Sequence, residues 1–109
     1  MDYRLITTER QFKDCTAMGR KDFLELCKDI NIWYEEKYGK TYENYILENV
    51  TEPPKFSTLN DALFFVLFQK KNDLIYGSLG ATFKMDGSSA HLNYNKFNTM
   101  LENVLKKKG

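Results

Sequence analysis

The stretch that decides the fold is "TLNDALFFVLFQKKN", residues 58–72. Apolar side chains occupy almost every position from 59 to 68, so a helix over this stretch has no polar side. A helix of that kind is normally buried at the centre of its domain. Ser57 or Thr58 offers the hydroxyl that caps a helix N-terminus. We therefore expect a central helix here, with the rest of the chain packed around it.

Two helical patterns precede this stretch. Thr8 and Gln11 fit a capping box, which predicts a short helix that ends near Gly19. Apolar residues from 20 to 38 then recur at i, i+3, i+4 and i+7, as in an amphipathic helix. Gly39 can take the left-handed conformation after the last turn of that helix.

The segment 41–55 is patterned less clearly. Residues 41–50, "TYENYILENV", suit a short helix or an irregular segment, although their aromatic and β-branched content would also suit a strand. Pro53 and Pro54 break any helix and mark the main internal boundary. This boundary is too short to be a linker between domains. The mixed pattern of residues 41–50 leaves the conformation of 41–55 open.

Two more helices are expected after the central one. Asp73 can cap a helix that runs to about Phe83, and Ser88 can cap another whose inward face extends to Leu105. No part of the chain has the alternation and turn spacing of a sheet protein. The sequence thus predicts one all-α domain, 1–109, of about five helices, with N-terminal helices in 1–52 and a helix-turn-helix region in 57–105.

The charges are nearly balanced over 109 residues, with 16 Lys and Arg against 15 Asp and Glu. Their distribution is uneven, because residues 1–56 carry a net charge of −2 and residues 57–109 a net charge of +3. The positive half is mildly favourable for nucleic acid. It does not exclude a protein that never binds phosphate.

The composition argues against a metal, a cofactor and a membrane anchor. Cys15 and Cys27 form no C-x-x-C pair, and His91 is the single histidine, so the usual zinc-site spacings cannot be assembled. No window approaches the roughly 18 apolar residues of a membrane span, and the N-terminus lacks the apolar core of a signal peptide. We expect a cytoplasmic protein with reduced thiols and no membrane partner.

The segment around "FKMDGSSAHLNYNKF", residues 83–97, raises the question of DNA recognition. A helix-turn-helix needs two helices held at a steep angle by a turn of three or four residues. Gly80 would allow the two helices to approach closely, and Ala90 would pack back from the second one. The outer face and its borders then present the expected DNA contacts: Ser88, Ser89, His91, Leu92, Asn95 and Lys96 at the groove, and Lys70, Lys71 and Lys84 near the phosphate backbone.

The same spacing also fits simpler structures. A short helix, a polar turn and a capped helix describe many α-hairpins that bind no DNA. His91 on an exposed face can be merely solvated. The Phe64, Phe65 and Phe68 cluster fits a core, not a platform for single-stranded nucleic acid, because its helix has no polar side.

Residues 56–90, "FSTLNDALFFVLFQKKNDLIYGSLGATFKMDGSSA", resemble the N-terminal helix-turn-helix of DDE-type insertion-sequence transposases. In that family a "L-x-D-x-L-L-F-x-L-F" helix leads through a "K-x-N" corner to "L-G-x-x-F-G-M-D-G-S". Residues 19–30 look more loosely like the helix that precedes it. The matching positions are Leu59, Asp61, Leu63, Phe65, Leu67, Phe68, Lys71, Asn72, Leu79, Gly80, Phe83, Met85, Asp86, Gly87 and Ser88.

The resemblance implies a DNA-binding part that recognises insertion-element ends beside a catalytic partner. In the family an RNase H-like nuclease with three carboxylates follows this segment, whereas the chain ends at Gly109. We therefore expect no enzyme activity, and double-stranded DNA as the partner of a homodimer or of a chain that works with a catalytic transposase chain. A separate reading frame, a truncated chain and a degenerate copy all fit these features.

The sequence departs from the family at the turn and on the outer face. Lys84 stands where relatives usually have Gly, so it must either become left-handed or shift the turn by a residue. His91 and Leu92 replace residues that tend to be basic, which lowers the expected affinity and salt dependence. Two alternatives stay open: a homodimerisation module and a small transcriptional regulator.

Overall fold

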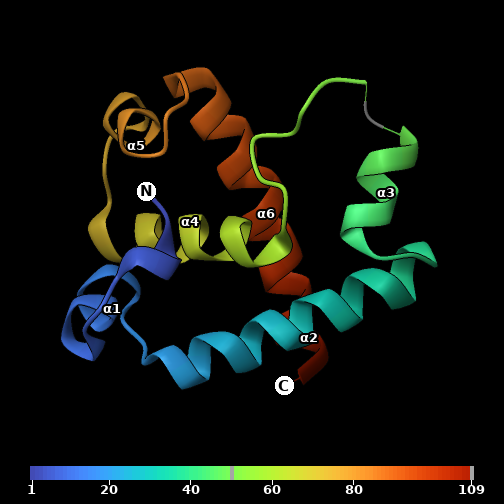
Figure 1. Ribbon diagram of the computed structural model, residues 1–109, viewed down its shortest axis with the longest axis horizontal. Helices are drawn as coiled ribbons and strands as arrows, with labels where there is room; N and C mark the ends of the chain where they lie inside the picture. Colours follow the sequence, from blue (N-terminus) through green and yellow to red (C-terminus); the bar gives the residue numbers. More distant parts are fainter. Residues whose placement is uncertain (50, 109) are drawn as a thin grey trace.

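The computed structural model describes residues 1–49 and 51–108, which form helices joined by short connections, without a strand in these two ranges (Figure 1). This confirms the all-α class. One more α-helix is present than the five expected, because residues 42–49 are helical; Val50 lies outside the described residues. In chain order the elements are η1 (Tyr3–Leu5, a 3-10 turn), α1 (Glu9–Thr16), α2 (Arg20–Tyr38), α3 (Tyr42–Asn49), α4 (Leu59–Asn72), α5 (Tyr76–Thr82) and α6 (Gly87–Lys108).

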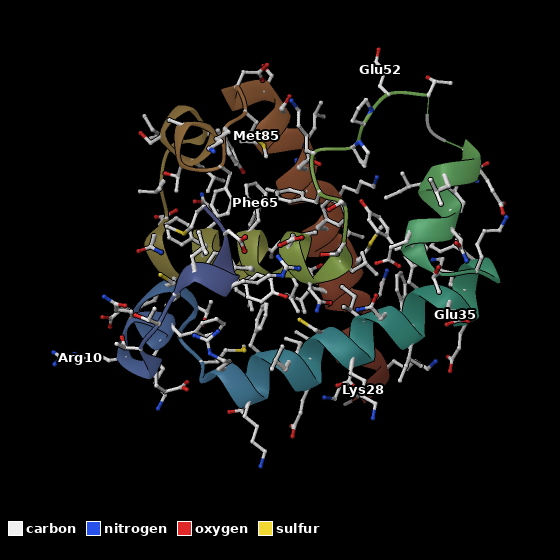
Figure 2. All side chains as sticks on the ribbon, in the orientation of Figure 1. Arg10, Lys28, Glu35, Glu52, Phe65 and Met85 are labelled. Atoms are coloured by element: carbon white, nitrogen blue, oxygen red, sulfur yellow. The ribbon has the colours of Figure 1, made fainter. Side chains whose placement is uncertain are left out.

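Helix α4 forms the centre of the core, as its composition predicts. All residues from 62 to 69 are buried, and the helix packs against α1, α2 and α6. Thr58 provides the N-cap, since its Oγ1 accepts a hydrogen bond of 3.1 Å from Asp61 N. Figure 2 shows Phe65 in the interior, where its ring lies 4.9 Å from that of Phe83, while charged side chains such as Lys28 project outward.

The ends of α1 and α2 agree with the prediction in part. Thr8 caps α1 by accepting a 3.1 Å hydrogen bond from Gln11 N. The expected end near Gly19 was wrong, because α1 stops at Thr16, where the left-handed Ala17 (φ 64°) reverses the chain. Gly19 instead occupies the N-cap position of α2. Gly39 ends α2 in the left-handed conformation, with φ 75°, as expected.

The link between α4 and α5 differs from the prediction. Asp73 does not cap α5; it is left-handed, with φ 49°, and ends α4, because Asp tolerates this conformation better than most residues. Gln69 then holds the turn: its Nε2 donates to Leu74 O at 2.8 Å, and its Oε1 accepts from Leu74 N at 3.1 Å. Helix α5 therefore begins only at Tyr76.

Helix α6 also begins and packs differently from the expectation. Asp86, not Ser88, is the cap, since Asp86 Oδ1 accepts a 2.7 Å hydrogen bond from Ser89 N. The prediction that Leu105 lies on the inward face was wrong, since Leu105 is 49% exposed. With 3.6 residues per turn, the buried side of α6 passes through Val104 instead. The buried residues of α6 are Ala90, Phe97, Met100, Leu101 and Val104.

The segment before α4 is fixed by Tyr42, whose hydroxyl donates a 2.8 Å hydrogen bond to Phe56 O. Burial raises the pKa of Tyr42 from 10.0 to about 12. The folded chain thus holds this proton more tightly than the unfolded chain does. The stabilisation from neutral Tyr42 is complete below pH 10 and is lost as the pH rises through about 12.

We expect this loss to amount to about 2 kcal/mol at pH 12 for Tyr42 alone. Urea denaturation at pH 8 to 12 should therefore show a shallower alkaline decline for Tyr42→Phe than for the wild type. Tyr34 and Cys27, which also have raised pKa values, are present in both proteins and cancel in the comparison. Equal alkaline slopes would contradict the assignment.

Candidate nucleic-acid interface

Helices α5 and α6 are joined by four residues, Phe83 to Asp86, and pack against each other (Figure 1). Gly80 in α5 lies directly against the backbone of this turn. A Cβ atom there would lie 2.3 Å from Met85 O, and Met85 N already donates a 2.8 Å hydrogen bond to Gly80 O. The close contact expected at Gly80 is therefore present, but it is made with the backbone of the turn.

Lys84 takes the left-handed conformation, with φ 61°, so the turn is not shifted. For a residue with a side chain this conformation costs about 1 kcal/mol relative to a right-handed one. The Lys84 side chain is exposed at the surface beside the turn. The strain thus lies in the residue that connects α5 to α6.

The inner side of this unit is apolar. Leu79 and Ala90 are fully buried, and Phe83 and Met85 are half-buried around the turn. Phe83 reaches the central helix, with its ring 4.9 Å from that of Phe65. This packing fixes the first turns of α6 relative to the core.

The outer side of α6 presents most of the residues predicted to contact DNA. Because successive helix residues are rotated by about 100°, these side chains lie opposite Ala90 and Phe97. Leu92 is 70% exposed and is the apolar member of this face. Ser89 is half-buried and its backbone N–H is used by the cap; the exposed members are Ser88, His91, Leu92, Asn95 and Lys96.

His91 stacks on Tyr76 of α5, with ring centroids 4.5 Å apart and planes inclined by 20°. Sequence reasoning missed Tyr76, whose half-buried ring connects the outer face of α6 to the start of α5. An i, i+15 pair across a turn has no periodic signal from which it could be read. One face of the His91 ring is covered by the Tyr76 ring, so the imidazole is less mobile than one that is solvated on both faces.

The lysines that were predicted to lie near the phosphate backbone of DNA differ in how close they are to α6. Lys70 Nζ lies 5.8 Å from the centroid of the Tyr94 ring, so Lys70 borders α6. Lys71 is exposed on α4 and makes no ion pair or aromatic contact with the described residues of α5 and α6. Lys96 Nζ lies 5.2 Å from the Phe97 ring, at the edge of the outer face.

Comparison with protein-family models, with curated proteins and with solved structures finds no match to this chain. No helix in the described ranges is long and apolar enough to cross a lipid bilayer.

Proposed function

We propose that the chain is a DNA-binding protein in which α5, the turn 83–86 and α6 act as a helix-turn-helix. The observation that carries the proposal is the polar outer face of α6, held rigidly over a four-residue turn by the close contact at Gly80. A helix-turn-helix presents the N-terminal part of its second helix to the major groove in this way. The first three turns of α6 are the corresponding segment.

The side chains on this face suit the edges of bases. The Asn95 amide can donate to and accept from adenine, and Leu92 can contact the methyl group of thymine. Lys96 can reach a phosphate or a guanine. Lys70 and Lys84 border the face and supply charges for the DNA backbone.

The resemblance of residues 56–90 to insertion-sequence transposases supports a specific role for such a domain. We propose that it recognises the ends of an insertion element as the DNA-binding part of a transposase, with no catalysis of its own. With only a few exposed lysines at this face, affinity should be modest, in the micromolar range at physiological salt. A second domain bound to the same DNA, from a homodimer or a catalytic chain, would raise it.

An electrophoretic mobility shift titration with mixed duplex DNA tests this function. We expect retention at micromolar protein that weakens as salt is raised from about 50 to 200 mM. Concentration-dependent dimerisation without any salt-sensitive DNA retention would overturn the proposal in favour of a homodimerisation module. Protection of inverted-repeat ends in a footprint would favour a transposase over a transcriptional regulator.

Two substitutions separate base contacts from phosphate contacts. Lys96→Ala should weaken binding to every sequence and lower the slope of log K against log salt by about 1. Asn95→Ala should instead lose roughly tenfold discrimination at a single base position, with little change in salt slope. Lys28→Ala, on the outer side of α2, is the matched control and should leave both quantities unchanged (Figure 2). Identical behaviour of the Lys96 and Lys28 variants would argue against α6 as the contact surface.

A further inference from the structure

A hollow of about 590 Å³ lies beside the turn that joins α5 to α6. Three segments far apart in the sequence border it: the η1 region, the residues just before α4, and the turn itself. Its lining includes the aromatic side chains of Phe64 and Phe83 and both kinds of charge: the cations of Arg4, Lys55 and Lys84, and the carboxylates of Asp2 and Asp61. The hollow therefore combines apolar and charged lining beside the turn that leads into the proposed groove-binding helix.

The acidic groups of the hollow are already neutralised in part. Arg4 Nη1 lies 2.7 Å from Asp61 Oδ1 and 3.2 Å from Asp2 Oδ1, so one guanidinium is shared by two carboxylates. Lys55 and Lys84, in contrast, form no ion pair with any residue in 1–49 or 51–108. Neither ammonium group therefore lies within 4 Å of a carboxylate in these two ranges.

Lys55 is held near the N-terminus of α6. The next residue, Phe56, is buried and is anchored twice, by the hydrogen bond from Tyr42 and by its ring 4.9 Å from that of Phe65. The hydrogen bond from Ser89 N lowers the pKa of the Asp86 carboxyl, and the positive charge of Lys55 lowers it further. The charge of Lys55 therefore acts where α6 begins.

Lys84 occupies a backbone conformation in which glycine is more stable. Strain of this kind persists where the rest of the structure imposes it, and it is often found at binding sites. The Lys84 side chain is exposed and forms no ion pair with the described residues, so neither packing nor an ion pair offsets the strain. What lysine provides at this position, and glycine would not, is a positive charge.

We propose that Lys55 and Lys84 together bind a phosphate group at the mouth of this hollow. Ammonium groups are point charges that suit a phosphate oxygen without a fixed geometry. On the proposed function, this phosphate belongs to the backbone of the duplex that α6 reads. The site then fixes the register of α6 in the groove without reading a base.

Two titrations test the site and distinguish its sources of phosphate. The first adds inorganic phosphate to the 15N-labelled full chain at constant ionic strength, with chloride as the control anion. We expect saturable amide shifts at residues 55–57 and 83–86, which both Lys55→Ala and Lys84→Gly abolish. The second measures duplex binding against salt, where each variant should lower the slope by about 1 for every sequence, as Lys28→Ala should not.

Lys84→Gly adds a readout that separates charge from folding. Glycine relieves the left-handed strain of about 1 kcal/mol but gains freedom in the unfolded chain, so this variant should melt at or slightly above the temperature of the wild type while binding phosphate less well. A purely structural role would move melting temperature and binding in the same direction. Lys55→Ala, outside any helix, tests the same charge loss without a change at the strained position.

The outcomes for the site and for the proposed function are distinct. Saturable phosphate shifts without duplex binding would keep the site, assign it to a free phosphate compound and overturn the DNA function. Duplex binding whose salt slope is unchanged in both lysine variants, together with no phosphate shifts, would overturn the site and leave the DNA function in place. Absence of both would overturn both.

Discussion

Gly80→Ala is expected to destabilise the protein by about 3 kcal/mol and to abolish DNA binding. The added methyl group would lie 2.3 Å from Met85 O and 2.9 Å from Asp86 O. Both atoms belong to the backbone of the turn, so no flexible side chain can move aside. Relief requires α5 to separate from the turn, which would also break the hydrogen bond from Met85 N to Gly80 O.

Gly77→Ala is the matched control, in the same helix and three residues away. A Cβ atom at Gly77 meets nothing within 4 Å, and alanine favours a helix over glycine. This variant should be as stable as the wild type or more stable by up to about 1 kcal/mol. Urea denaturation of the three proteins measures the difference. Equal stability of the two variants would mean that the turn does not lie against α5.

The features that composition and steric rules determine could be predicted. The burial of α4 follows from the nearly continuous apolar run at its centre, and Gly80 was expected to allow a close contact, although that contact is made with the turn and not with α6. Lys84 left two choices open, and the structure adopts the left-handed one. Each of these follows from a local property of one helix or one turn.

The helix ends were harder to predict, because several residues compete for each cap. Asp73 and Ser88 both have capping side chains, yet Asp73 ends α4 and Asp86 caps α6. Gln69 donates one hydrogen bond to Leu74 O and accepts another from Leu74 N, and α5 begins only after this link. Gln69 lies within the apolar helix, and nothing in its sequence position reveals that its amide turns back on the following link.

The rim of the hollow could not be predicted either. Arg4 and Asp61 are 57 residues apart, and their contact depends on how η1 lies against α4. Lys55 follows two prolines in a segment whose conformation the sequence left open. Only the packing of Phe56 and Tyr42 brings it near α6, which is a tertiary effect without a local signature.

Phe64→Ala is expected to have the largest effect on stability, a loss of about 3 to 5 kcal/mol. Phe64 is 1% exposed, and its ring lies 5.8 Å from that of Tyr3 and 6.0 Å from that of Phe12. The rings of Phe23, Phe68 and Phe83 each lie 6.2 Å away. Truncation would therefore leave a cavity between η1, α1, α2 and the α5–α6 turn that no single neighbour can fill.

A loss of this size is comparable with the whole stability of many small domains, which is about 5 to 15 kcal/mol. Phe64→Leu, which keeps most of the volume, should lose much less, and Leu47→Ala, at a side chain 81% exposed, should be nearly neutral. Chemical denaturation of the three variants gives the comparison. Phe64→Leu changes one lining residue of the hollow but keeps both lysines, so a folded Phe64→Leu protein should still show the phosphate shifts. A loss of stability in Phe64→Ala as small as that in Leu47→Ala would show that the aromatic cluster is not the core.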